Sequence, residues 1–147
     1  MTVYELIKKH EGERLKPYKC TAGKWTVGVG FNFDDNKLPE DINKYLTEHG
    51  EITQEMSDRL LTISVGWAAR DCRALFPEFD TFTENRQMAL IDWLFQLGHY
   101  RASKFVNSIH MINTGRWEAA AENMIKSNWA KQTPNRAKEV TKMIEEG

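Results

Sequence analysis

Hydrophobic residues recur at two different periods along the chain, and the period changes once. Val3, Leu6 and Ile7 are spaced as on one face of a helix, which should end near Gly12. From residue 18 to residue 33 apolar side chains instead alternate with polar residues or glycine, which predicts a β-hairpin or a small meander. Gly23 in the intervening segment suits the positive φ that a tight turn needs.

Helical spacing returns after a loop that begins at residue 34, and it continues to the C-terminus. A short helix should start at Pro39 or Asp41. From Thr53 onward the whole chain is predicted to be helical. Over residues 53–76 an apolar stripe, interrupted by Gly66, is expected to consist of Met56, Leu60, Ile63, Trp67 and Leu75.

The segment 83–98 is apolar on nearly every side in its middle, which is typical of a buried central helix. Thr83 is its expected N-cap and Gly98 its expected end. Trp93 and Phe95 should therefore belong to the core. Two more helices are predicted over 103–115 and 117–127.

The last predicted helix covers residues 133–146, with Thr133 as N-cap and Pro134 at the first helical position, where its missing N–H costs nothing. The pattern as a whole predicts an α+β fold that is mostly α, in a single domain over residues 1–147. Its small lobe should span about 12–55 and contain the hairpin, while 1–11 and 56–147 form a larger helical lobe. A ligand site is expected in the cleft between the lobes.

The composition limits the possible functions but does not identify one. The chain has 147 residues, of which 41% are hydrophobic and 28% charged, as in ordinary soluble globular proteins. The net charge of −1 gives no reason to expect a nucleic-acid partner. Residues 34–55 hold seven acids against two lysines, a net of −5, and residues 126–142 hold five bases against one acid, a net of +4. The basic segment could attract an anionic polymer, although a solvated helix face explains it more simply.

Cysteines and histidines give no sign of a metal site. Cys20 and Cys72 lack CxxC spacing, and no two of the four histidines stand at metal-binding helical spacing, so neither metal nor cofactor is expected. Nothing in the sequence supports a disulfide between the two cysteines. The first twelve residues lack the apolar core of a secretory signal, and no apolar run is long enough to cross a bilayer. We therefore expect synthesis in the cytoplasm.

Three reactive side chains lie close together near the N-terminus. Cys20 follows Glu11 by nine residues, and Thr26 comes six residues later. A partly buried carboxyl group at the end of a helix would have a raised pKa and could act as a general acid. Each residue also has a plain structural explanation, namely a surface acid, a small core hydrophobe and a good β-former. Taken singly, none of the three identifies a site.

Taken together, the stretch EGERLKPYKCTAGKWTVGVG resembles the signature of the phage-type lysozymes: Glu-Gly, an aromatic residue, Asp or Cys, a turn glycine, and then Thr-Ile/Val-Gly-x-Gly. The similarity continues through WLFQLG and FVNSIHMINTGRWEAAAENMIKSNWAKQTPNRAKEV, which are similar in order and spacing to the helical lobe of the T-even members. It covers nearly the whole chain and is weakest over residues 31–55.

The resemblance implies a lysozyme-like fold and a muramidase that hydrolyses the β-1,4 bond between N-acetylmuramic acid and N-acetylglucosamine in peptidoglycan. Glu11 falls on the family's general acid, Cys20 on a position more often held by aspartate, and Thr26 on the hydroxyl that helps place the attacking water. An oxocarbenium-like transition state needs a proton donor on one face and a negative or basic group on the other. A free thiol is mostly protonated at pH 7, so Cys20 could be a general base, a nucleophile or a polar placeholder.

Further contacts follow from the resemblance alone. Positions that line the family's saccharide cleft are matched by Asn32, Phe95, Gln96, Ser108 and Asn123. Arg136 matches a basic residue that pairs with the catalytic glutamate, and Gly30 closes the glycine signature. Gln96 and Asn123, as polar residues inside apolar helices, should need hydrogen-bond partners.

Two departures from the family pattern stand out. Phe31 replaces a histidine, so that packing should replace a buried His–Asp pair. The sequence also stops at Gly147, before the family's usual end, which would leave the first helix with less cover.

Three function classes are compatible with these residues. The first is an active endolysin, which the intact Glu11, Cys20 and Thr26 favour, acting as a monomer on the wall in the periplasm. It would reach glycan strands through a holin-like partner that opens the inner membrane, or within a phage particle. The second is a peptidoglycan-binding domain that is catalytically weak or inactive. The third, a cysteine-dependent hydrolase, lacks a histidine partner for Cys20, since His10 is close only in sequence.

Overall fold

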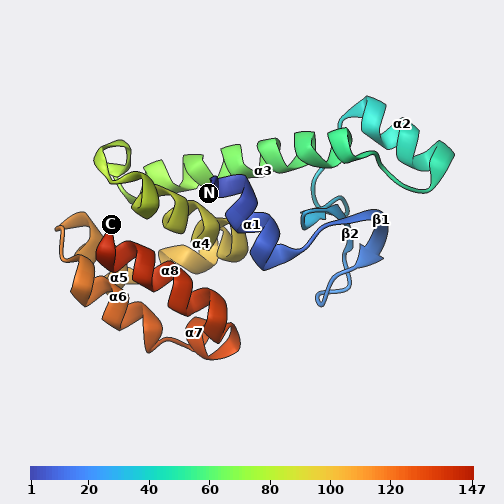
Figure 1. Cartoon of the computed structure of the whole chain (residues 1–147). Coiled ribbons are helices and arrows are strands. Elements are labelled where there is room, and N and C mark those ends of the chain that lie inside the picture. Colours follow the sequence, from blue (N-terminus) through green and yellow to red (C-terminus); the bar gives the residue numbers. More distant parts are fainter. The chain divides into compact units, whose positions relative to one another are not determined.

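A computed structural model describes all 147 residues and divides them into two compact units. The sheet unit comprises Tyr4–Val65, and the helical unit comprises Met1–Val3 with Gly66–Gly147. The boundary falls inside α3 (Gln54–Leu75), the long green helix of Figure 1. No helix is both long and apolar enough to cross a membrane.

The sheet unit combines helices with a small antiparallel sheet, and this α+β arrangement confirms the predicted fold class. Its helices are α1 (Val3–Glu11), α2 (Glu40–His49) and the first part of α3. The three strands, in the order β1-β2-β3, are β1 (Arg14–Lys19), β2 (Trp25–Gly28) and β3 (Phe31–Asn32).

Of the two predicted alternatives, a hairpin and a small meander, the structure has the meander, with three strands. Tyr18 pairs with Thr26 across β1 and β2, and Val27 pairs with Phe31 across β2 and β3. Gly23 has φ +76°, as predicted for the first turn. The alternation expected through residue 33 is broken because Gly28 and Gly30, both at φ +69°, turn the chain between β2 and β3.

The core of the sheet unit is small and mainly aliphatic. It consists of Val27, Phe31, Leu38, Ile42, Ile52 and Leu60. Phe31 is buried in this cluster, which confirms that its side chain contributes to packing.

The buried face of α3 differs from the predicted stripe. Gly66 does not interrupt the helix, since a single glycine in a helix interior costs only about 1 kcal/mol relative to alanine. Trp67 was expected in the core but is 37% exposed. The buried positions also include Leu61, Val65, Ala68 and Cys72, which follow helical spacing on a face one residue away from Trp67. The prediction for Trp67 was wrong because the buried face of the helix passes through the neighbouring position, Ala68.

The helical unit contains five α-helices besides its part of α3. They are α4 (Glu84–Ser103), α5 (Val106–Asn113), α6 (Trp117–Ile125), α7 (Asn128–Gln132) and α8 (Pro134–Glu146), and a short 3-10 helix, η1 (Phe79–Thr81), precedes them. The longer helices confirm the prediction. The short α7 and η1 were not predicted.

Helix ends in this unit follow the expected residues with two differences. The Thr83 hydroxyl accepts a hydrogen bond from the Arg86 N–H at 3.3 Å, as an N-cap should. Gly98 (φ 76°, ψ 164°) breaks the helix as expected, but helical turns resume beyond it as far as Ser103. Thr133 occupies the N-cap position of α8, yet its hydroxyl donates to the Trp129 carbonyl at 3.0 Å instead of capping α8.

The core of the helical unit is larger and aromatic. Trp93 of α4 is fully buried, as predicted, and its ring meets Phe105 edge-on at 5.1 Å and Trp129 at 6.3 Å between centroids. Cys72 is also buried, and both cysteines are free thiols. α4 contributes more residues to this core than any other element.

Candidate active site

Glu11 lies at the C-terminal end of α1, where the chain turns into the sheet. Gly12 ends the helix with φ +76°, and its N–H donates to the Lys8 carbonyl at 2.9 Å. This left-handed cap suits glycine because a side chain at positive φ is strained. The Glu11 side chain is only partly exposed, and the strand β1 begins three residues after it.

Cys20 follows directly after β1, in the turn that leads into β2. Its N–H donates to the Lys24 carbonyl at 2.9 Å, and its carbonyl accepts from the Gly23 N–H at 2.8 Å. The backbone N–H groups of Lys24 and then Ala22 donate toward the sulfur and lower the pKa of the Cys20 thiol, and the Thr26 hydroxyl adds to this effect. The turn thus stabilises the thiolate, the form of cysteine that acts as base or nucleophile.

Thr26 occupies the middle of the sheet, opposite Tyr18 on one side and Asn32 on the other. Its side chain is buried, and its hydroxyl is 3.0 Å from the Lys24 carbonyl oxygen, to which it donates. The same hydroxyl lies within hydrogen-bonding reach of the Cys20 sulfur. The structure therefore brings Cys20 and Thr26 together.

Tyr18 connects these groups with Glu11 and was not singled out from the sequence. Burial raises the pKa of the Tyr18 phenol, and the negative charges of Glu11 and Cys20 raise it further, against the effect of Arg14. The Arg14 guanidinium carbon lies 4.7 Å from the centre of the Tyr18 ring. Glu11 and Cys20 are thus both close enough to one phenol to affect its ionisation. Alternation along β1 gave no signal that distinguished this tyrosine from a packing residue.

Asn32 and Gly30 have local structural roles in the same unit. The Asn32 side-chain oxygen accepts from the backbone N–H groups of Asp34 and Asp35 at 3.0 and 3.1 Å. Its amide nitrogen donates to the Asp35 carboxylate at 3.0 Å. Gly30 provides the positive φ before β3. The Asn32 side chain thus orders the loop after β3, and a substrate contact by it remains a prediction.

The other predicted substrate contacts lie in the helical unit. Gln96 accepts a hydrogen bond from the Trp129 indole N–H at 2.8 Å, and the Asn123 amide donates to the Ser108 hydroxyl at 2.8 Å. Both polar residues therefore have the partners that the sequence required. Phe95 packs, partly buried, against the aromatic core.

Ser108 and Asn123 meet at a surface hollow of about 310 Å³. Lys104 and Lys126 also line this hollow, as do Phe105, Val106, Asn107 and Ser127. This recess of the helical unit therefore contains two of the predicted saccharide contacts, Ser108 and Asn123. The amino groups of Lys104 and Lys126 lie beside them.

Arg136 is bound within the helical unit by a carboxylate that sequence reasoning did not identify. Its Nε lies 3.0 Å from Asp92 Oδ2 and its Nη2 lies 3.1 Å from Asp92 Oδ1, which makes a bidentate pair. Asp92 is completely buried and Arg136 nearly so. No sequence motif links residues 44 positions apart, so only the fold reveals this partner.

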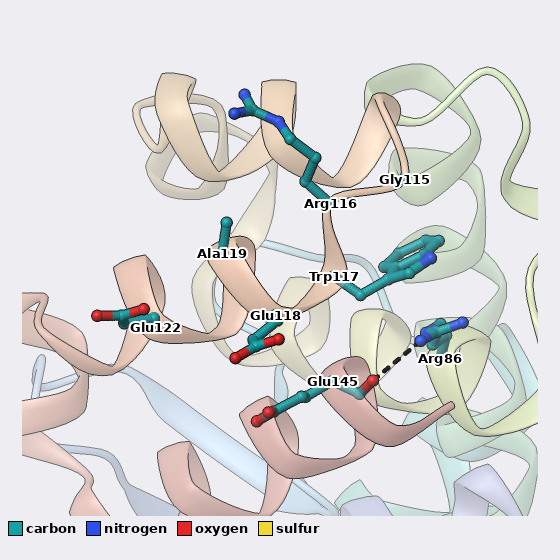
Figure 2. Close-up of a pocket in the computed structure, with 8 residues that line it drawn as sticks. All are labelled: Arg86, Gly115, Arg116, Trp117, Glu118, Ala119, Glu122 and Glu145. Atoms are coloured by element: carbon teal, nitrogen blue, oxygen red, sulfur yellow. Dashed lines mark hydrogen bonds between the residues drawn. The ribbon is translucent and has the colours of Figure 1, made fainter.

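A second hollow, of about 510 Å³, lies over α4, α6 and α8 and contains none of the predicted site residues. Figure 2 shows the Arg86 guanidinium beside the Trp117 ring, 4.1 Å from its centre, while Arg116 points away from both. Arg86 donates to the Glu145 carbonyl at 3.0 Å, the dashed line in Figure 2. Glu118, Glu122 and Ala119 form the rest of the wall with Gly115. In this hollow Arg86 serves to cap the end of α8.

Comparisons with known proteins identify the family of this chain. The family model described as phage lysozyme matches residues 8–144. A probable T4-type lysozyme of Dictyostelium discoideum is 29% identical over 97% of this chain and 93% of its own length. An endolysin of Acyrthosiphon pisum secondary endosymbiont phage 1 is 29% identical over 88% of this chain and 78% of its own. The pre-baseplate central spike protein Gp5 of Enterobacteria phage T4 is 30% identical over 98% of this chain but only 28% of its own length. Since the family model spans nearly the whole sequence, the chain belongs to the phage lysozyme family.

Proposed function

We propose that the protein is a muramidase that hydrolyses the β-1,4 bond between N-acetylmuramic acid and N-acetylglucosamine in peptidoglycan. The observation that carries the proposal is the turn after β1, which holds a thiol of lowered pKa beside the Thr26 hydroxyl. Glu11 acts electrostatically on the same Tyr18 phenol as that thiol. Membership of the phage lysozyme family supports the same reaction class.

In this mechanism Glu11 is the general acid and protonates the glycosidic oxygen as the bond breaks. Positive charge then develops on the sugar ring, and the Cys20 thiolate supplies the negative or basic group on the opposite face. Thr26 holds the attacking water, and Cys20 accepts its proton. The proton balance is complete, because Glu11 loses one proton to the leaving group and Cys20 gains one from water.

Sugar binding is assigned to the remaining predicted residues. We place Asn32 on the sheet unit beside the reacting groups, and Phe95, Gln96, Ser108 and Asn123 on the helical unit along the glycan. The recess that contains Ser108 and Asn123 supports this assignment. Arg136 and Gly30 act as supporting residues, Arg136 through charge and Gly30 through the turn before β3.

The test is digestion of purified peptidoglycan by the full chain. We expect the turbidity of a wall suspension to fall and new reducing ends to appear on N-acetylmuramic acid, identified by borohydride reduction and mass spectrometry of the products. Reducing ends on N-acetylglucosamine, or a loss of turbidity through released peptides, would contradict the proposed bond. Sedimentation with the wall without any cleavage would instead favour the alternative, an inactive peptidoglycan-binding domain.

The configuration of the first product tests the role of Cys20. Activation of water by a base on the opposite face inverts the anomeric carbon, whereas attack by the thiolate would give retention through a covalent intermediate. We expect inversion, measured by proton NMR of a soluble oligosaccharide digest before mutarotation. Retention would assign Cys20 as a nucleophile.

Access to the wall is proposed to need help from outside this chain. We infer that the protein is made in the host cytoplasm as a monomer and acts in the periplasm, after a holin-like partner opens the inner membrane or by delivery within a phage particle. The likeness to a spike protein supports the second route. Cells that express the chain should lyse only after chloroform permeabilises the inner membrane. Lysis without chloroform would contradict this requirement.

A further inference from the structure

One buried hydroxyl group lies against two segments of the sheet unit that carry proposed catalytic residues, those of Glu11 and Thr26. Ser57, in the second turn of α3, is completely buried. Its Oγ donates to Glu13 Oε2 at 2.6 Å, a short charge-assisted hydrogen bond. Glu13 stands two residues after Glu11, where the chain passes from the α1 cap into β1. The first contact of Ser57 is therefore with the Glu11 segment.

The second contact of Ser57 is with the strand that carries Thr26. A Cβ atom built on Gly28 would lie 3.0 Å from Ser57 Oγ, so the β2 backbone passes directly over the hydroxyl. Gly28 is two residues beyond Thr26, and it pairs across the sheet with Arg14, the neighbour of Glu13. Ser57 thus lies where the exit from α1 and the end of β2 meet.

The polar contacts around Glu13 form an inner and an outer part, which are linked by the Gln54 amide and by Lys8, whose Nζ lies 3.8 Å from Glu13 Oε2. In the inner part, Glu13 accepts from Ser57 and from the Gln54 amide at 3.0 Å, and its side chain is only 23% exposed. In the outer part, Asp58 accepts from Lys8 and from the same Gln54 amide, each at 3.0 Å, and its side chain is 54% exposed. Exposed ion pairs contribute little to stability, so the outer part gives a natural control for the inner one.

We propose that Ser57 and Glu13 are positioning residues for the proposed hydrolysis. Their hydrogen bond holds the chain that leaves Glu11 against the strand that carries Thr26, and so keeps the proton donor and the water-placing hydroxyl at productive spacing. This inference rests on the proposed muramidase function. A displacement of about 1 Å at reacting groups, caused from a distance, can lower a rate by about 100-fold.

The test compares steady-state kinetics of four variants on a soluble peptidoglycan oligosaccharide, at a temperature where circular dichroism shows every variant folded. Ser57→Ala and Glu13→Leu should lower kcat by roughly 10-fold to 100-fold with little change in KM. Glu13→Gln keeps an oxygen that accepts from Ser57 and should retain most of the wild-type kcat. Asp58→Asn removes only the outer ion pair and should leave kcat unchanged.

A double variant tests whether the two residues act through one bond. Ser57→Ala combined with Glu13→Leu should be no slower than the slower single variant, because the same hydrogen bond is lost in each. Wild-type kcat in Ser57→Ala and Glu13→Leu, or equal losses in these two and in Asp58→Asn, would overturn the positioning role while leaving the muramidase intact. Failure of the wild-type chain to release any reducing ends would overturn both proposals.

Discussion

The two units of the molecule are stabilised by different kinds of interaction. The sheet unit has a small core and several exposed ion pairs, among them Lys24–Asp35 at 3.3 Å and Arg59–Asp41 at 2.7 Å. The helical unit has a large core of interlocking aromatic rings around Trp93 and a buried Arg136–Asp92 pair. Apolar burial dominates folding free energy, whereas exposed ion pairs contribute about 0–1 kcal/mol each. Most of the stability should therefore come from the helical unit.

The proposed chemistry lies almost entirely in the other unit. Glu11, Cys20 and Thr26 all belong to the sheet unit, at a helix end, a turn and a short strand. Reactive groups need solvent, adjustable charge and access to substrate, which a dense aromatic core cannot supply. Activity and stability should accordingly respond to different substitutions, and the following changes test that separation.

The largest effect is expected at Glu11. Glu11→Gln keeps the size and hydrogen bonding of the side chain but removes the proton, so the rate of reducing-end release should fall by at least about 10²–10⁴-fold. The melting temperature should stay close to the wild-type value, because the side chain is outside both cores. Assays at equal folded concentration measure both quantities. Near wild-type activity in this variant would remove Glu11 from the mechanism.

The next largest effect is a difference in the free energy of unfolding between alanine variants of two tryptophans. Trp93→Ala should destabilise the fold by about 3–5 kcal/mol, because it leaves a cavity in a core with close aromatic contacts. Trp25 is 43% exposed and has Lys19 Nζ at 5.3 Å from its ring centre, so Trp25→Ala should cost much less. Urea unfolding at 25 °C measures both. Equal losses would show that the helical unit does not dominate stability.

A smaller effect concerns the two cysteines. Lys24 and Ala22 N–H groups lower the pKa of the Cys20 thiol, so iodoacetamide should modify it at a rate that rises with pH and reaches half-maximum below the value of a free cysteine. Burial raises the pKa of the Cys72 thiol, which should react only as the protein unfolds. Peptide mapping by mass spectrometry follows each site, with Cys20→Ser as control. Faster modification of Cys72 than of Cys20 would contradict the assignment.

The smallest effect is expected from an exposed ion pair of the sheet unit. The hydrogen bond from Arg59 lowers the pKa of Asp41 below its ordinary value, which is about 3.9 in an unfolded chain. The pair therefore stabilises the fold above about pH 4, and this contribution is lost as the pH falls through the lowered pKa. Asp41→Asn should slightly flatten the acid side of the curve of melting temperature against pH. Glu48→Gln on the same helix α2 is the control, and an equal change there would contradict the role of the pair.

Local patterns predicted the parts of this fold that depend on neighbouring residues. Helical spacing located α4, α5, α6 and α8, and turn chemistry located the Thr83 cap and the Gly23 turn. Trp67 was misplaced because one helix position decides between core and solvent, and hydrophobicity alone does not fix that position. The five residues of α7 are too few to show a clear period.

Partners far apart in sequence could not be predicted in the same way. Asp92 binds Arg136 and Ser57 binds Glu13, each across 44 residues, and neither pair leaves a periodic or motif signal. The candidate catalytic residues were found through their resemblance to a family rather than through geometry. The N–H groups that lower the pKa of the Cys20 thiol come from the backbone. Every residue except proline has such a group, so the sequence does not show which of them will point at the sulfur.

The most direct test of the separation between chemistry and stability is the rate of reducing-end release by Cys20→Ala, measured together with its melting temperature. The substitution removes only a partly exposed sulfur next to a strand end, so the free energy of unfolding should change by no more than about 0.5 kcal/mol. We predict that most activity is lost, while Cys20→Asp, which is ionised at pH 7, keeps a substantial part of it. Digestion of peptidoglycan by Cys20→Ala at the wild-type rate would contradict this account and would leave Cys20 as a packing residue.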